Sequence, residues 1–255
     1  QLTASVEGDI RTTLLTVTPW LKILTLGNTT VVGGNSVLGR VTLEKVTPVD
    51  RVVNLFSNNA VAPVPATVTV PAGSNTATFP INTFGVAATT VPPVAITATH
   101  NSASKSQNLE FTPAVLTSLT FFPNRVSGGA PAVCRVTLNG KVPVNTDIIV
   151  DAFPSVVPDI DLDPATAGVQ TTRTVTILAN SPVTEGRYVE FTVNAPTVAA
   201  GTSRTLRARR AATLTEPVTG TLFIDATDIQ SISIDLAGNA PYTVSGGTVV
   251  TGRVN

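Results

Sequence analysis

The chain has 255 residues, and its 16 basic and 16 acidic residues cancel to a formal net charge of zero at pH 7. This balance excludes a global field that would draw the chain to nucleic acid or an acidic membrane, and no apolar run approaches the roughly 20 residues of a membrane-spanning helix. The composition includes 42 Thr, 37 Val, 18 Gly and 19 Pro residues. Because β-branched residues favour strands while Gly and Pro favour turns, it predicts an all-β protein of many short strands.

The first segment of the chain repeats a later one. LTASVEGDIRTTLLTVTP (2–19) aligns without a gap with ITATHNSASKSQNLEFTP (96–113), at an offset of 94 residues. The later segment covers the last two strands expected of a whole repeat. Residues 1–20 are therefore predicted to be the tail strands of a preceding repeat.

Residues 21–115 are predicted to form a complete repeat. Turn signals such as Gly33-Gly34 separate short runs rich in β-branched residues. Val37, Gly39, Val41 and Leu43 share one predicted face and alternate with Leu38, Arg40 and Thr42 on the other, which is the two-residue period of a half-buried strand. Seven strands at this spacing favour an immunoglobulin-like sandwich of about 100 residues. They are expected near 21–26, 36–44, 50–57, 66–70, 75–82, 93–99 and 104–112.

The same Gly-Gly turn and following strand occur three times. Each copy places an Arg six residues after its second Gly: VVGGNSVLGRVTL (31–43), VSGGAPAVCRVTL (126–138) and VSGGTVVTGRVN (244–255). TRTV (172–175) is aligned with TATF (76–79) in the same scheme. The predicted fold is a row of tandem immunoglobulin-like sandwiches arranged end to end. Its further parts are a second complete repeat at 116–212, a linker or short hairpin at 213–228, and the first strands of another repeat at 229–255.

The segment VPAGSNTATFPI (70–81), with the preceding Gly-Gly turn and G-R-V-T-L strand, resembles the immunoglobulin-like repeats of large bacterial surface proteins. These include invasin- and intimin-like adhesins and giant exported repeat proteins. The resemblance implies an extracellular or cell-surface location and a role as spacer, stalk or fibre-forming module. It transfers no active site, because the repeat motif carries none.

Few residues are candidates for chemistry. His100 is the only histidine and is expected in a surface turn. Metal site, nucleophile elbow and phosphate-loop motifs are missing from the sequence, so no catalytic or cofactor-binding residue is assigned. Calcium is the one candidate metal, because three carboxylates alternate in PDIDLDP and hard cations prefer oxygen ligands. The alternative is a polar outer face over inward Ile160 and Leu162. The calcium candidates are Asp159, Asp161 and Asp163.

Arginines form two further patterns. Four of them lie within seven positions and are interpreted either as a solvated strand edge or as a site for an anionic polymer. Three others recur at one repeat position and are expected to make packing contacts or structural salt bridges. The first set is Arg204, Arg207, Arg209 and Arg210, and the second is Arg40, Arg135 and Arg253.

Two single residues complete the set of candidates. The lone cysteine, Cys134, excludes an internal disulfide and is expected as a small buried residue. Trp20 lies at a predicted junction between repeats, where it would bury the seam or stack on a sugar.

The sequence thus favours a non-catalytic structural module of an extracellular bacterial fibre, filament or adhesin stalk. Its expected partners are copies of itself or neighbouring repeats of a larger chain. A glycan- or protein-binding adhesin module and an accessory segment of a secreted enzyme remain open. The end segments are expected to be covered, by a longer parent chain or by strand addition between molecules. The residues expected to face that cover are Ile232, Ile234, Val250 and Val254.

Overall fold

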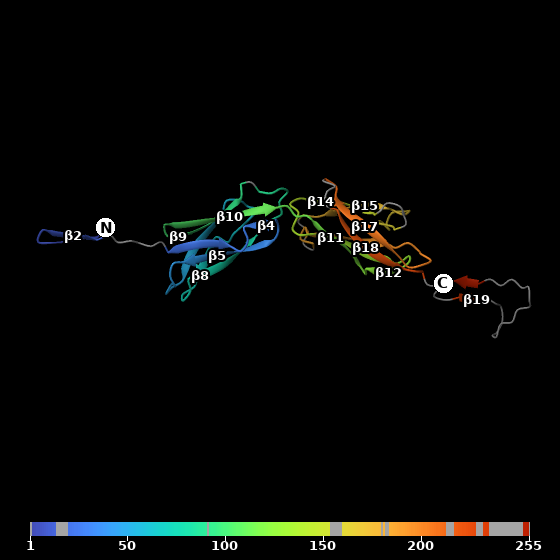
Figure 1. The fold of residues 1–255 in the computed structure, drawn as a ribbon, viewed down its shortest axis with the longest axis horizontal. Coiled ribbons are helices and arrows are strands. Elements are labelled where there is room, and N and C mark those ends of the chain that lie inside the picture. Colours follow the sequence, from blue (N-terminus) through green and yellow to red (C-terminus); the bar gives the residue numbers. More distant parts are fainter. Residues whose placement is uncertain are drawn as a thin grey trace, which may run out of the picture. The chain divides into compact units, whose positions relative to one another are not determined.

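The fold was analysed in a computed structural model of the chain. It describes residues 2–13, 20–90, 92–153, 160–179, 181, 184–212, 217–227, 232–234 and 252–254. The described residues form strands, turns and loops, with no helix among them (Figure 1). This confirms the predicted all-β class. Within the described part of the chain, no helix is present that could cross a membrane.

The chain divides into two compact units. Unit 1 contains residues 1–115 together with segments 138–146 and 177–187. Unit 2 contains residues 116–137, 147–176 and 188–255. The end-to-end arrangement of separate repeats stays a prediction.

Unit 1 holds a three-stranded and a five-stranded sheet. The first has the order β3-β5-β8, and the second has the order β4-β10-β9-β6-β7. The seven predicted strands are present, and the sequence missed only β4, which has three residues. The bounds are β3 Leu21–Leu26, β4 Thr30–Val32, β5 Ser36–Leu43, β6 Arg51–Ser57, β7 Thr67–Val70, β8 Thr76–Asn82, β9 Val94–His100 and β10 Ala103–Thr112.

Unit 2 repeats this plan strand for strand. Its sheets have the orders β11-β13-β16 and β12-β18-β17-β14-β15. The parallel pairing of β4 with β10 is matched by that of β12 with β18. The bounds are β11 Leu116–Phe122, β12 Arg125–Ser127, β13 Pro131–Leu138, β14 Thr146–Ala152, β15 Thr172–Ile177, β16 Tyr188–Asn194, β17 Thr202–Arg210 and β18 Val218–Asp225.

The last strand of unit 2 corrects the sequence prediction. Residues 218–225 form β18, which pairs antiparallel with β17 and completes the sheet, so they are not the predicted linker or hairpin. The TRTV segment lies in β15, the counterpart of β7, whereas TATF lies in β8. The alignment was wrong because the loop before β15 is ten residues longer than the loop before β7.

The core of unit 1 lies between its two sheets. Buried side chains come from both, for example Val41 and Ile81 from one sheet and Ile96 and Phe111 from the other. The predicted inward positions of β5 are confirmed, because Val37, Gly39, Val41 and Leu43 are buried, and β13 shows the same alternation of buried residues. The sheets thus pack face to face as sandwiches, and burial of these apolar side chains is the main term that stabilises them.

Gly39 occupies a core position for a steric reason. A Cβ atom there would lie 2.3 Å from the ring of Phe79, which faces Gly39 across the β5–β8 pair. The matching position of unit 2 is Cys134, which faces Phe191 across the β13–β16 pair. One unit therefore fills this site with an aromatic ring against a glycine, and the other fills it with a ring beside a thiol.

Both end segments form short antiparallel pairs. The hairpin of β1 (Leu2–Val6) and β2 (Asp9–Thr13) has the register of β9 and β10, since Val6 faces Asp9 as His100 faces Ala103. Strands β19 (Ile232–Ile234) and β20 (Gly252–Val254) pair in the register of β3 and β5. The side chains of Ile232, Ile234, Val250 and Val254 lie outside the described residues.

Candidate functional site

The expectation of a surface histidine was wrong. His100 is the last residue of β9, and its side chain is only 8% exposed. Its Nδ1 lies 2.8 Å from the carbonyl oxygen of Val52, and its Nε2 is buried with no hydrogen-bond partner. The carbonyl can only accept, so Nδ1 carries the proton. Because strand alternation turns His100 inward with Ile96 and Ala98, its position serves packing.

The acidic segment PDIDLDP has its carboxylates engaged by the protein itself. Asp161 Oδ1 accepts hydrogen bonds from the backbone N–H groups of Asp163 (3.1 Å) and Gln170 (3.0 Å). Asp163 accepts from the Thr166 hydroxyl and pairs with Arg173 at 3.5 Å. Ile160 and Leu162 are buried, as the structural alternative expected.

Calcium binding stays untested at this segment. Asp159 lies outside the described residues. Across the residues that the structure does describe, no three His, Cys, Asp or Glu side chains are grouped to hold a metal ion. The local hydrogen bonds of Asp161 and Asp163 hold the loop in place.

This loop covers an edge strand of unit 2. The N–H of Asp161 donates to the carbonyl oxygen of Asn194 in β16 (3.1 Å), and Asn194 donates in return (2.9 Å). Arg173 also donates to the Thr192 carbonyl oxygen. Open backbone groups on edge strands invite pairing with other chains, so the loop blocks this edge.

Unit 1 protects the equivalent edge differently. Pro80 of β8 faces Leu38 just as Thr192 of β16 faces Val133, and Val133 follows Leu38 by 95 residues. The Leu43 N–H donates to the Asn75 carbonyl oxygen, so Asn75 and every second residue after it point their backbone groups toward β5. Pro80 lies between these residues, and its backbone therefore points away from β5, toward the open edge. Proline has no N–H, so this edge lacks one donor that an added strand would need.

The interpretation of the arginine-rich segment as a solvated strand edge was wrong. It forms β17, which lies between β14 and β18 in the middle of the five-stranded sheet. Arg207 Nε and Nη2 bind the two oxygens of Asp151 at 2.9 and 2.8 Å, and Arg209 reaches the same carboxylate at 2.7 Å. The hydrogen bonds that Arg207 donates to Asp151 raise the pKa of Arg207 above its ordinary value. Arg204 and Arg210 also have partners.

Two of the three recurring arginines are described, and their surroundings differ. Arg135 binds Glu190 through Nε (2.7 Å) and Nη2 (2.6 Å), and its guanidinium lies 4.7 Å from the centre of the Tyr188 ring. This is the expected structural salt bridge. Arg40 is exposed and faces Thr78 in place of a carboxylate. The side chain of Arg253 lies outside the described residues.

Cys134 and Trp20 both have packing environments. The thiol is fully buried, and burial raises its pKa to about 12, so it stays protonated at neutral pH. It is the small buried residue that we expected. Trp20 is partly buried, and the Arg51 guanidinium lies 4.9 Å from its ring centre. Whether Trp20 also covers a junction between repeats stays untested.

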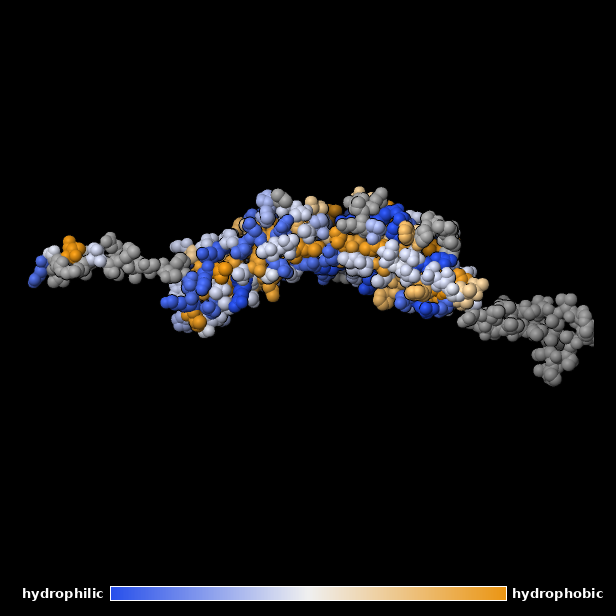
Figure 2. Space-filling view, in the orientation of Figure 1, coloured by the Kyte–Doolittle hydropathy of each residue, from blue (hydrophilic) through white to orange (hydrophobic). Residues whose placement is uncertain are grey.

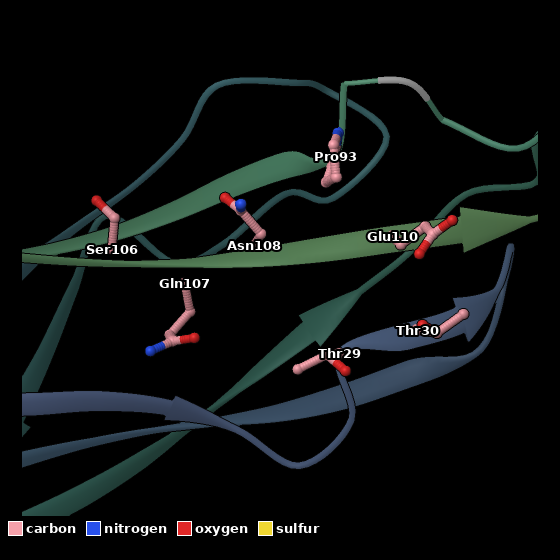
Figure 3. A pocket seen from close by; sticks show the side chains of 7 residues that line it. All are labelled: Thr29, Thr30, Pro93, Ser106, Gln107, Asn108 and Glu110. Atoms are coloured by element: carbon pink, nitrogen blue, oxygen red, sulfur yellow. The ribbon is translucent and has the colours of Figure 1, made fainter.

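A polar hollow of about 350 Å³ lies beside β10 in unit 1. In Figure 3, Ser106 and Asn108 project to one side of β10, whereas Gln107 projects to the other side, on which Thr29 and Thr30 also lie. The sequence gives no sign of this hollow, because its residues come from segments far apart in the chain. They are Thr29, Thr30, Pro93, Ser106, Gln107, Asn108 and Glu110.

No family model and no curated protein matches the chain. Among solved structures, the D0-D1 domain of intimin is 13% identical, with 81% of this chain and 99% of that chain covered and a TM-score of 0.31. The Yersinia pseudotuberculosis adhesin InvE is 14% identical, with 90% and 67% covered and a TM-score of 0.33. These neighbours are intimin and invasin-like adhesin domains, the kind of protein whose repeats the sequence resembles.

Proposed function

We propose that the chain is a non-catalytic structural module of an extracellular bacterial fibre, filament or adhesin stalk. The observation that carries this proposal is that one eight-stranded sandwich is built twice with the same strand order. Repetition of a self-contained sandwich adds length without adding new chemistry. The pairs β1–β2 and β19–β20 follow the same plan, because their registers match those of β9–β10 and β3–β5.

The surroundings of the histidine, the cysteine and the paired arginines support a structural role. His100 and Cys134 are buried in the sandwiches, and Arg135, Arg173 and Arg207 hold strands or loops through ion pairs. A reaction centre needs a reactive group that a substrate can reach. These side chains are either buried in a core or held in ion pairs with other residues of the chain.

Assembly through strand contacts is the finer part of the proposal. A two-stranded hairpin is only marginally stable by itself in water. We expect the β1–β2 and β19–β20 pairs to be covered by further protein in the working assembly. Other repeats of a longer chain and copies of the same chain are both suitable partners.

The location can be tested on intact cells of the source organism. Gold-labelled antibodies raised against the chain should bind the outside of unpermeabilised cells. Labelling that appears only after permeabilisation would contradict an extracellular fibre or stalk.

Strand assembly needs a separate test. The full chain and a variant lacking residues 1–13 are compared by sedimentation velocity over a wide concentration range. Copies that assemble through the hairpin should associate in the full chain and much less in the variant. Equal association of both proteins would contradict self-assembly through β1–β2 and leave other repeats of a longer chain as the cover.

A glycan- or protein-binding module is the second candidate. Exposed aromatic side chains favour it, in particular Phe56, which is 63% exposed on the outer face of the five-stranded sheet of unit 1. An accessory segment of a secreted enzyme has no observation in its favour in the described residues.

A further inference from the structure

The outer face of the five-stranded sheet of unit 1 is rich in Thr, Ser and Asn and almost uncharged, and Val52 and Phe56 are exposed apolar side chains on it. One row crosses three strands, because Phe56 of β6 faces Thr97 of β9, and Thr97 faces Ser106 of β10. The Thr97 and Ser106 hydroxyls are 2.8 Å apart and share a hydrogen bond. The row therefore places an exposed aromatic ring beside two hydroxyl groups.

The neighbouring rows carry the same kinds of side chain. Asn54 faces Thr99 on one strand and Thr67 on the other, and Thr99 faces Ser104. Asn108 lies two residues beyond Ser106 on the same side of β10 (Figure 3). Hydroxyl and amide groups can both donate and accept hydrogen bonds, so this face offers both functions without a net charge.

The face continues into the polar hollow at β10. Ser106 and Asn108 line both the face and the hollow, and Glu110 is the only charged residue of the lining. In the described part of the chain, the side chains of Thr29, Thr30 and Gln107 make no hydrogen bond, whereas the Ser106 hydroxyl is bonded to Thr97. Their donors and acceptors are thus available to a ligand.

Figure 2 shows that hydrophobic and hydrophilic side chains are interspersed on the visible surface. An exposed aromatic surrounded by hydroxyls and amides differs from an apolar docking patch, which is continuous. It also differs from a site for an anionic polymer, which needs Lys or Arg. Phe56 and its polar neighbours combine an apolar surface with hydrogen-bonding groups.

We propose that this face binds a neutral oligosaccharide. The Phe56 ring would stack on the apolar side of one sugar ring, while Thr97, Ser106 and Asn108 would bind hydroxyl groups of the chain. Two inter-strand spacings separate Phe56 from Ser106, about 10 Å. That span suits an oligosaccharide better than a single sugar. Acidic glycans are disfavoured, because Glu110 would repel them.

Unit 2 provides an internal contrast. Its row at the same sheet positions is Asp151, Arg207 and Thr219. Asp151 is bound by Arg207 and Arg209, so these side chains are already engaged. The proposal therefore assigns sugar binding to unit 1 alone, and it does not depend on the structural role proposed above.

Titration of the full chain, labelled with nitrogen-15, tests the proposal. Maltotriose, cellotriose and chitotriose serve as neutral probes, and a heparin tetrasaccharide serves as the acidic probe. At ~10 mM, a ligand with a Kd of ~1 mM occupies most sites. At least one neutral probe should shift the amide signals of β6, β9 and β10, and heparin should leave them unchanged.

Two variants locate the site. Phe56→Ala should weaken binding about tenfold or more, and Asn108→Ala should weaken it severalfold. Phe122→Ala is the matched control, because Phe122 is 62% exposed and lies in unit 2. This control should bind as tightly as the unaltered chain. Since Phe56 and Phe122 are both exposed, thermal melts should show that both variants stay folded.

Several results would overturn the proposal. One is that no neutral probe shifts the β6, β9 and β10 signals, and another is that heparin shifts them equally. Binding that survives Phe56→Ala would place the sugar elsewhere. Self-association that depends on Phe56, without any sugar-induced shift, would assign the face to a second copy of the chain.

Discussion

Equivalent rows of the five-stranded sheets differ in chemistry between the two units. Unit 1 has Phe56, Thr97 and Ser106, whereas unit 2 has Asp151, Arg207 and Thr219. The strand order and register beneath both rows are the same. The fold is therefore specified by the inward positions and the turns, and the outward positions are free to carry an ion-pair network in one unit and a neutral face in the other.

The largest effect expected from this comparison concerns the ion-pair network. Asp151→Ala should destabilise the protein by about 2–3 kcal/mol, because Arg207 and Arg209 would be left partly buried without their acceptor. Phe56→Ala, at the matched position of unit 1, should cost less than about 1 kcal/mol, because its side chain is mostly exposed. Urea unfolding of each variant measures both values. Equal losses would mean that the two rows contribute alike.

The core pair gives the next largest effect. Gly39→Ala should destabilise unit 1 by about 1–3 kcal/mol, because the new methyl group would overlap the buried Phe79 ring. Cys134→Ala, at the matched position, removes one sulfur atom and should cost about 1 kcal/mol. Thermal unfolding followed by fluorescence and calorimetry compares them. If Gly39→Ala is neutral, the Phe79 ring is not held as closely as the structure shows.

The buried thiol predicts a dependence on pH. Burial raises the pKa of Cys134 from 9.0 to about 12, so the unfolded chain loses its thiol proton at a lower pH than the folded chain. The contribution of this thiol to stability is constant well below pH 9 and is lost progressively from about pH 9 to 12. At pH 10 the loss should be about 1.4 kcal/mol relative to neutral pH.

Cys134→Ala is the control for that measurement. The variant should lack this share of the alkaline loss, while all other titrating groups remain. Urea unfolding at pH 7 and at pH 10 gives the difference. An identical alkaline loss in both proteins would show that the thiol does not contribute.

The smallest expected change concerns the protected edges. Pro80→Thr gives β8 the residue that β16 carries at Thr192 and restores an N–H to its open edge. Stability should change by less than about 0.5 kcal/mol, whereas aggregation on prolonged incubation should increase. Light scattering measures the aggregation. The matched variant Arg173→Ala uncovers the Thr192 carbonyl oxygen in unit 2 and should also increase aggregation. Unchanged scattering in both would mean that neither device protects its edge.

Much of the fold could be predicted because its signals are local. The alternation of Val37, Gly39 and Val41 and the Gly and Pro turns locate the seven long strands of unit 1. The three-residue strand β4 is too short to show a period. Strand β18 was missed because a longer loop before β15 shifted the alignment of the second repeat.

The candidate sites could be predicted less well, because they depend on which strands become neighbours. The sequence shows four arginines close together, but Asp151 lies more than fifty residues before them. Whether a strand is central or at an edge is decided by pairing between distant segments. For the same reason, the inward turn of His100 and the row from Phe56 to Ser106 became visible only in the folded chain.

The central claim is that one eight-stranded sandwich is built twice, and hydrogen exchange of the full chain tests it most directly. Amides in the interior of β17 and β18 should exchange as slowly as those of β9 and β10, because each pair occupies the same place in its sheet. Slow exchange throughout 218–225 would support two complete copies. Fast exchange there, beside slow exchange in β10, would show that these residues are a linker and would contradict the repeated sandwich.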